Sequence, residues 1–464
     1  MSFPQKTQRS IIVVGSGLAG LSAATTIVQT NPKIPVVILE KFAKPGGNSI
    51  KASSGINGAN TIFQHWPDTS FESDTIKSSG NSLLESDWRN GRLELISEMC
   101  TQSKESVEWL SGLGVDLTRV ARLGGHSVAR THRGDGPVPP GASIITTLLK
   151  LLQGKAQLKL ECEVTKILTD DEGKVIGVEY NGANRLYGPV IFTTGGFAGS
   201  HEYISKYAPE LINLPTTNSE RPGTQHLLSS LGVELVDMSN VQIHPTGWVE
   251  HFNRDDRVKF LAPEALRGEG GILINDKGDR FVNELDTRKR VSDAIINTIV
   301  RDPYADPKLQ QYKLWILLDE ETYKSTKASS DFYLAKKLLW KTNFASMEAS
   351  FVNIRSTLQA YGSSSKDPFN RPTRGNWNIP KFTPETVLYI GQVTPVVHFT
   401  MGGAKFNTRA QPLTASGPVS GLWVAGEITG GIHGDNRLGG SSLLECAVFG
   451  RIAGSEAVKY YEEQ

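Results

Sequence analysis

The sequence has few of the residues that build cross-links and metal clusters. Its three cysteines, Cys100, Cys162 and Cys446, lie far apart and form no CxxC pair. A disulfide framework, an iron–sulfur cluster and a zinc site therefore have no basis in the sequence, and we expect no bound metal. A reducing compartment follows as the expectation, and with it a cytoplasmic location.

Long apolar runs and an excess of one charge are also missing. No apolar run approaches the roughly 18 residues that a membrane-spanning helix needs, so we expect no membrane insertion. Lys plus Arg number 49 and Asp plus Glu number 48, which gives a formal net charge of +1. This balance favours neither nucleic acid nor an acidic membrane surface as a partner, so the ligand has to be inferred from local motifs.

Glycine is abundant, with 46 of 464 residues. Such a composition is typical of a globular α/β enzyme with many tight turns, and the length exceeds the roughly 250–300 residues at which single cores stop growing. Between two glycine-rich parts lie charged stretches that suggest helices, such as 319–341, and a linker-like segment, 361–380. We therefore predict one domain in two segments, 1–237 and 396–464, with a second domain inserted at 238–395.

A dinucleotide-binding motif opens the chain. The sequence GSGLAG (15–20) follows an apolar strand-like run and begins a helical pattern, and Glu40 ends the next apolar run twenty residues on. Gly15 permits the tight turn, Gly17 lets backbone approach a pyrophosphate, and Gly20 permits close helix packing. We expect Glu40 to accept a hydrogen bond from a ribose hydroxyl. A merely structural glycine-rich turn is the less favoured alternative.

The motif alone does not separate FAD from NAD, because both cofactors use this turn. A second small-residue segment, 45–57, suits packing against a flat ring system that a nicotinamide enzyme does not need. Two further glycine clusters, Gly195-Gly196 and 439–442, indicate additional close approaches of backbone to one large cofactor. The sequence therefore favours FAD.

Longer segments carry a resemblance to a known family. These are KASSGING (51–58), LGGHSVARTH (123–132), VQIHPTG (241–247), EALRGEGGILIND (264–276), RFVNEL (280–285), HFTMGG (398–403) and HGDNRLGGSSLLE (433–445). Together they resemble the fumarate reductase and succinate dehydrogenase flavoprotein family, and within it the stand-alone soluble fumarate reductases of fungi. The resemblance implies an α/β fold with a Rossmann-like FAD-binding domain in the two outer segments and an α+β capping domain between them.

The resemblance also implies how FAD is held. In membrane-bound members of the family that this chain resembles, a histidine near the second glycine cluster attaches FAD covalently. This chain has Gly47-Asn48-Ser49-Ile50 at that place, which implies noncovalent FAD. The implied contacts come from residues of both outer segments, most of them glycine, hydroxyl or amide residues. They are Gly15, Gly17, Ala19, Gly20, Glu40, Lys41, Gly47, Asn48, Ser49, Ser53, Ser54, Gly55, Ile56, Asn57, Val164, Thr194, Gly195, Gly196, Gly426, Glu427, Arg437, Ser441, Ser442 and Leu443.

The chemistry implied is reduction of fumarate to succinate, which needs a hydride, a proton and two restrained carboxylates. By resemblance His244 and Glu264 lie near one carboxylate, and His398 and Arg437 hold the other. Arg288 is implied as the proton donor, supplied through Glu264 and Arg267. The implied substrate-binding residues are Gly55, His244, Glu264, His398, Arg437 and Gly440.

The chain departs from the family pattern at Pro263, at Asp286 and Lys289 around Arg288, and in a short loop near Thr224. Two alternatives therefore stay open: a related FAD-dependent enzyme acting on a different unsaturated carboxylate or C=C substrate, and a flavin-binding protein without this chemistry. No haem or iron–sulfur motif is present, so we expect a diffusible electron donor such as a reduced flavin.

Overall fold

A parallel sheet forms the centre of the first structural unit. The computed structural model describes residues 9–136, 138–363, 366–379 and 381–464; the polar start of the chain, 1–8, and parts of the expected linker lie outside this description. The apolar runs IIVV and VVIL form fully buried, adjacent strands because both faces of the sheet are covered. The strand order is β20 (Leu422–Val424), β10 (Val190–Phe192), β1 (Ile11–Val14), β2 (Val36–Leu39) and β6 (Gln157–Lys159).

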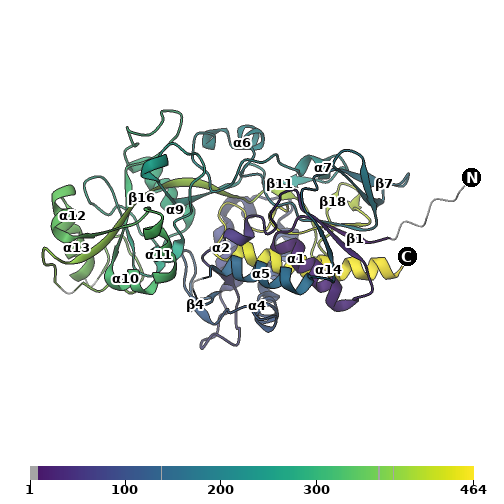
Figure 1. Ribbon diagram of the computed structural model, residues 1–464, viewed down its shortest axis with the longest axis horizontal. Helices are drawn as coiled ribbons and strands as arrows, with labels where there is room; N and C mark the ends of the chain where they lie inside the picture. Colours follow the sequence, from purple (N-terminus) through teal and green to yellow (C-terminus); the bar gives the residue numbers. More distant parts are fainter. Residues whose placement is uncertain (1–8, 137, 364–365, 380) are drawn as a thin grey trace, which may run out of the picture.

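Helices cover this sheet and small antiparallel sheets flank it. Helix α1 (Leu18–Thr30) packs against α5 (Pro140–Leu152) and the long C-terminal helix α14 (Ser441–Glu462), all on one side in Figure 1. The remaining helices of this unit are α2 (Phe71–Leu84), α3 (Arg89–Thr101), α4 (Ser103–Gly112) and α7 (Gln225–Ser229), whereas α6 (His201–Tyr207) packs Tyr203 and Ile204 into a core of the second unit. The flanking strands are β7 (Val164–Thr169), β8 (Val175–Tyr180), β9 (Asn184–Tyr187), β3 (Ile56–Asn57), β4 (Arg119–Ala121), β5 (Thr131–Arg133), β11 (Leu235–Val236), β17 (Gly403–Ala404), β18 (Leu413–Thr414) and β19 (Gly417–Pro418).

The middle of the chain forms a second unit with its own cores, drawn in green in Figure 1. Its antiparallel sheet consists of β12 (Val241–Trp248), β16 (Val387–Thr400), β14 (Leu314–Asp319), β13 (Ile272–Ile274) and β15 (Trp340–Asn343). Its helices are α8 (Glu264–Gly268), α9 (Arg288–Thr298), α10 (Glu320–Ser325), α11 (Lys327–Ala335), α12 (Phe344–Ser350) and α13 (Ile354–Ser363). Strand β12 begins and the antiparallel strand β16 ends at the junction with the first unit, so each brings one predicted histidine there.

Two expectations for the second unit need correction. The stretch 319–341 is helical only to Ala335, because its apolar end Leu338-Leu339 is buried and leads into β15. The segment 361–380 is not a free linker in its described part. Arg371 is buried in it and pairs with Glu284 at 3.0 Å, and Trp377 packs into the core. The described residues 366–379 therefore form a packed loop.

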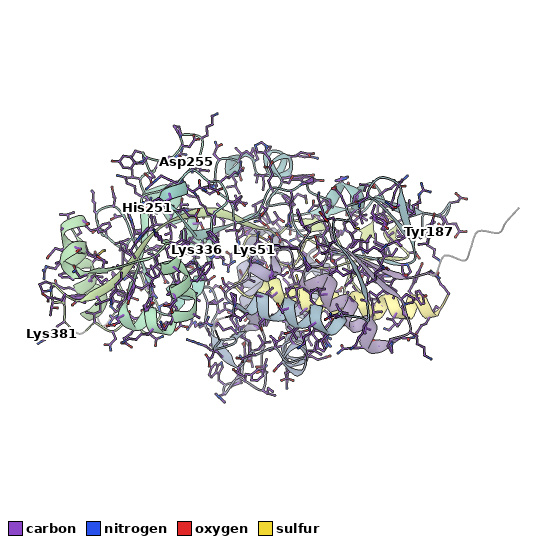
Figure 2. All side chains as sticks on the ribbon, viewed as in Figure 1. Lys51, Tyr187, His251, Asp255, Lys336 and Lys381 are labelled. Atoms are coloured by element: carbon purple, nitrogen blue, oxygen red, sulfur yellow. The ribbon has the colours of Figure 1, made fainter. Side chains whose placement is uncertain are left out.

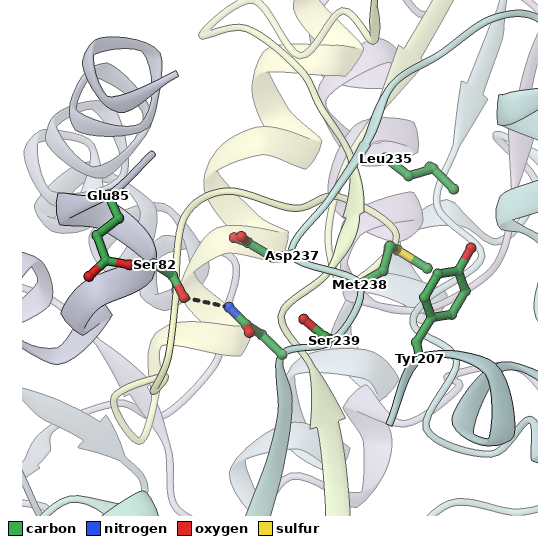
Figure 3. Close-up of a pocket in the computed structure, with 8 residues that line it drawn as sticks. Ser82, Glu85, Tyr207, Leu235, Asp237, Met238 and Ser239 are labelled. Atoms are coloured by element: carbon green, nitrogen blue, oxygen red, sulfur yellow. Dashed lines mark hydrogen bonds between the residues drawn. The ribbon is translucent and has the colours of Figure 1, made fainter. Parts of the chain in front are cut away.

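The chain first crosses into the second unit beside a cavity of about 520 Å³ (Figure 3). Asp237 adopts a positive φ of 57° there and forms a buried ion pair with Arg92 at 2.5 Å. Asn240 donates to the Ser82 hydroxyl at 2.8 Å, which ties the crossing to the end of α2. The crossing is therefore anchored at both of its ends.

Within the described residues, no helix is long and apolar enough to cross a membrane. The same residues contain no group of three or more His, Cys, Asp or Glu side chains placed to hold a metal ion.

Candidate active site

The GSGLAG turn joins β1 to α1 as the motif predicts. Gly15 has φ +105°, a conformation that side chains rarely adopt, and Gly17 stands at the N-cap of α1 without a capping side chain. Glu40 is buried at the end of β2 and accepts from the backbone N–H of Ser16 at 3.0 Å and from that of Phe42 at 2.9 Å. The acidic residue thus lies against the turn, while its contact with a ribose stays a prediction.

Three glycines leave space where a large cofactor fits. A Cβ at Gly17, Gly47 or Gly195 would meet nothing closer than 3.5 Å, and Gly17 and Gly47 face each other. The hydroxyl of Ser53 is buried and has no hydrogen-bond partner. Figure 2 places Lys51, from the same segment, near the middle of the molecule, whereas Tyr187 lies at the far end of the first unit. Open backbone and an unpaired donor fit the pyrophosphate and ring system of FAD.

The predicted cofactor residues come together from distant segments. The Asn57 amide donates to Gly439 O at 2.8 Å and to Ser441 Oγ at 3.0 Å, so β3 meets the start of α14. Gly440 caps that helix with φ +84°. Three further hydrogen bonds join distant segments. They connect Asn48 with Asn218, Thr194 with Thr224, and Glu427 with the backbone N–H of Thr400.

Other predicted cofactor residues lie in the walls or at the edge of this region. Lys41 is paired with Glu163 at 2.7 Å, and Val164 begins the outer strand β7. The rest lie in the first turn of α1, in segment 47–57, after β10, after β20 or in the first turn of α14. They are Ala19, Gly20, Ser49, Ser54, Gly55, Ile56, Gly196, Gly426, Ser442 and Leu443.

Two histidine rings face each other across β12 and β16. The ring centroids of His244 and His398 lie 5.4 Å apart at an interplanar angle of 63°. Nε2 of His244 is buried without a hydrogen-bond partner, while Nδ1 of His398 contacts Thr217 Oγ1 at 2.9 Å. Burial, and next the positive charge of Arg288, hold the pKa of both rings well below its usual value. Both imidazoles are therefore neutral at pH 7.

Arg437 is a buried cation without a carboxylate. Its side chain is 3% exposed, one nitrogen donates to Leu438 O at 3.1 Å, and Nε has no partner. Its guanidinium carbon lies 4.3 Å from the centre of the Phe399 ring. No described carboxylate lies within ion-pair distance, and burial, followed by the charge of Arg288, lowers the pKa to about 9. Because an unpaired buried charge is costly, this site favours an anionic ligand.

Arg288 and Glu264 form a buried ion pair beside the histidines. Arg288 Nε donates to Glu264 at 2.9 Å, and its Nη1 donates to Gln242 at 3.3 Å. Glu264 also accepts from the backbone N–H of Gly124 at 2.5 Å. Burial raises the pKa of Glu264, but Arg288 and Arg267 outweigh burial and leave it below its usual value. The carboxylate is therefore ionised.

Arg267 completes the predicted relay only partly. It is fully buried, and burial lowers its pKa to about 10. One nitrogen donates to Glu284 O at 2.7 Å, whereas Nε and the other terminal nitrogen have no partner. Arg267 thus interacts with Glu264 through its charge, without a direct hydrogen bond in this arrangement of the described residues.

The unusual neighbours of Arg288 turn away from it. Asp286 pairs with Arg290 at 3.4 Å and Lys289 pairs with Asp293 at 3.0 Å, both on the exposed side of α9. Thr287 caps that helix by accepting from the N–H of Arg290. Arg288 therefore keeps its buried position next to Glu264.

The sequence did not reveal a buried network behind Gly439. Arg130 is fully buried and donates to Asp68, Asp74 and Nδ1 of His126. Because Arg130 only donates, Nδ1 of His126 accepts, and its Nε2–H donates to Gly439 O at 3.0 Å. The motif LGGHSVARTH drew attention to this segment, but nothing local shows that Arg130 meets carboxylates 56 and 62 residues away.

Buried neutral histidines predict an acid-sensitive fold. Burial lowers the pKa of His126 and His132 to about 4, below the roughly 6.5 of an unfolded chain, so the unfolded state binds more protons. Stability is then fully present above pH 6.5 and falls toward pH 4. We expect each histidine to lower the free energy of unfolding by about 2 kcal/mol between pH 7 and pH 5, measured by urea denaturation at both pH values.

The matched variant is His126→Gln, whose amide keeps a donor and an acceptor but does not titrate. It should lose about 2 kcal/mol less between pH 7 and pH 5 than the wild type. An equal loss in both proteins would show that His126 is not kept neutral by burial.

The parallel sheet, the GSGLAG turn and the open space beside it are those of a flavoprotein with an FAD-binding domain. The family described as FAD binding domain matches residues 10–443. The chain is 43% identical to Fumarate reductase 1 of Saccharomyces cerevisiae, over 96% of this chain and 97% of that protein. It is 36% identical to Fumarate reductase of Schizosaccharomyces pombe, over 98% and 90%.

A solved structure of a fumarate reductase has a similar fold. The open conformation of a flavocytochrome c3 fumarate reductase superposes with a TM-score of 0.75 at 30% identity, covering 99% of this chain and 79% of that one. The chain belongs to the FAD-binding fumarate reductase family. These findings confirm the predicted family and fold class, whereas the boundaries at 237/238 and 395/396 stay a prediction.

Proposed function

We propose that this protein reduces fumarate to succinate with FAD bound noncovalently. The observation that carries the proposal is the pair of buried arginines, Arg288 and Arg437, facing two neutral histidines in one site. Only one of the two arginines has a carboxylate partner among the described residues. A small dicarboxylate supplies the negative charge that this site lacks, and fumarate is the substrate named for the most similar relatives.

The proposed binding roles follow from charge and donor supply. Arg437 and His398 hold one carboxylate, and His244 with Glu264 nearby orients the other. Gly55 and Gly440 both have positive φ, and a Cβ at either would clash with protein atoms, so glycine is needed at both positions; we assign their backbone to contacts with the substrate. A neutral imidazole donates a hydrogen bond to a carboxylate without adding a positive charge to the site. An added charge would bind the product succinate as tightly as the substrate fumarate.

The proposed proton donor is Arg288. Its Nε faces Glu264 and its Nη1 faces Gln242, so Nη2 is the nitrogen left without a hydrogen bond among the described residues. Reduced FAD supplies the hydride when bound. A proton leaves Nη2 for the other olefinic carbon. The ionised Glu264 then takes up a proton delivered from solvent through Arg267 and passes it to the neutral guanidine of Arg288, which restores both the cation and the carboxylate.

The test is an anaerobic assay with a chemically reduced flavin donor and a panel of unsaturated acids. We expect fumarate to be consumed with the highest kcat/KM and succinate to form in equal amount. Faster reduction of another acid would assign the site to that substrate. Tight FAD binding without any reduction would favour a flavin-binding role.

Noncovalent attachment is a separate prediction. Between Lys41 and Gln64 the chain contains no histidine, so the segment that borders the glycine-lined space offers no imidazole for a covalent bond. We expect acid precipitation to release all of the FAD into the supernatant, measured by absorbance and mass spectrometry. Flavin that stays with the precipitated chain would contradict noncovalent binding.

We also propose a diffusible electron donor of the reduced-flavin type, because the sequence offers no haem or iron–sulfur ligands. Mixing the oxidised protein with reduced FMN under argon should bleach the bound flavin.

A further inference from the structure

A basic cleft lies where the β4–β5 hairpin of the first unit meets the second unit. Its volume is about 270 Å³, and its walls include Arg119, Arg122 and Arg133 on one side and Gly268, Glu269 and Thr373 on the other. The three arginines belong to β4, β5 or the residue that follows β4. None of them belongs to the site described above.

The arginines outnumber the carboxylates that neutralise them. Arg119 and Arg133 both donate to the same oxygen of Glu269, at 3.1 Å and 2.5 Å. Asp135, at the rim, lies 3.6 Å from Arg119. Arg122 is exposed and has no ion-pair partner among the described residues. One part-buried carboxylate and one exposed carboxylate therefore serve three cations.

The sheet register adds a cost. Arg119 and Arg133 are direct partners across the antiparallel pair β4–β5, and like charges in that position repel. Arg133 is only 8% exposed, and one of its terminal nitrogens is buried without a hydrogen bond. A buried guanidinium with an unused donor favours a further anionic partner.

We propose that this cleft binds a small oxyanion carrying two negative charges, held by the guanidinium groups of Arg119, Arg122 and Arg133. Inorganic phosphate is the simplest member of this class, and a free dicarboxylate is the other source. Planar guanidinium forks match the oxygen spacing of both, whereas a single chloride ion satisfies only one fork. This site is independent of the proposed fumarate reduction.

Such an anion would lie between the two units. The hairpin pairs with β3 in the first unit, while Glu269 follows α8 in the second. Arg122 also donates to His126 O at 2.8 Å, and the neighbouring Gly124 donates to Glu264. Binding of the oxyanion in this cleft should therefore raise the melting temperature of the holoenzyme. It should also release heat in a titration.

The experiment is calorimetric titration of the holoenzyme with inorganic phosphate at low ionic strength. We expect one phosphate per chain, and at least tenfold weaker binding in Arg122→Gln and in Arg133→Gln. Arg122 is exposed, so its variant keeps the proposal testable if Arg133→Gln fails to fold. Arg185→Gln, at an exposed pair with Glu179, is the matched control and should bind as the wild type does.

A variant of the proposed active site separates the two sites. Arg437→Ala should still bind phosphate at the cleft. Loss of phosphate binding in Arg437→Ala together with its retention in Arg133→Gln would overturn the proposal. Competition by chloride at the same concentration as phosphate would also overturn it. So would the absence of any phosphate binding up to 10 mM, roughly the weakest affinity that is useful. Titration of fumarate into Arg437→Ala shows which oxyanion the cleft binds. Fumarate binding that is lost when Arg122→Gln is added to this variant supports a dicarboxylate. Phosphate binding without fumarate binding supports phosphate.

Discussion

Replacing Arg288 by alanine is expected to abolish fumarate turnover while leaving FAD bound. Arg288 begins α9, with its side chain buried between Glu264 and Gln242, whereas Arg267, the other cation beside Glu264, makes no hydrogen bond to that carboxylate. A general acid contributes typically 10²–10⁴-fold, and here the loss should exceed that range because Arg288 also contributes charge to the substrate space. The measurement is kcat in the anaerobic assay with FAD content determined on the same sample.

Two variants control this result. Arg288→Lys should recover only part of the activity, because lysine is shorter and lacks the planar fork. Arg290→Ala, two residues away on the exposed side of the same helix, should keep turnover close to that of the wild type. Turnover in Arg288→Ala within about tenfold of the wild type, well inside the general-acid range, would place the proton donor elsewhere, and Arg267 would be tested next.

Replacing Arg437 by alanine is expected to weaken fumarate and succinate binding by roughly 2–5 kcal/mol, which corresponds to about 30- to 5000-fold in Kd. Arg437 is buried, stacks on Phe399 and has no described carboxylate partner, so a bound dicarboxylate provides its counter-charge. Binding is measured by the change in the flavin absorbance spectrum on titration with succinate.

The control for this variant is Arg409→Ala, which removes a largely exposed arginine paired with Glu456 in the same C-terminal segment. Its Kd for succinate should match that of the wild type. An unchanged Kd in Arg437→Ala would place the dicarboxylate outside the space between His398 and Arg437.

The dinucleotide site could be predicted from the sequence because its information is local. Gly15 and Gly17 lie in the turn between β1 and α1, Gly20 lies in the first turn of α1, and Glu40 follows the neighbouring strand β2. Strand period, glycine spacing and the length of one helix are sufficient to place these residues.

The rest of the site is assembled from segments that no local pattern connects. His244 and His398 meet because β12 and β16 pair over a separation of more than 150 residues, and the family motifs, not their spacing, pointed to them. The Arg130 network and the paired arginines of β4 and β5 had no such guide, since tertiary contacts alone create them. Composition was misleading at 361–380, where Arg371 forms a buried pair with Glu284.

Fumarate reduction at this site is tested by single-turnover reoxidation of the reduced bound flavin by fumarate, followed by stopped-flow absorbance without oxygen. We expect complete reoxidation at saturating fumarate, one succinate per flavin, and a rate that collapses in Arg288→Ala while succinate binding persists. Reduced flavin that remains reduced while fumarate is bound would contradict the assignment of this site as a fumarate reductase.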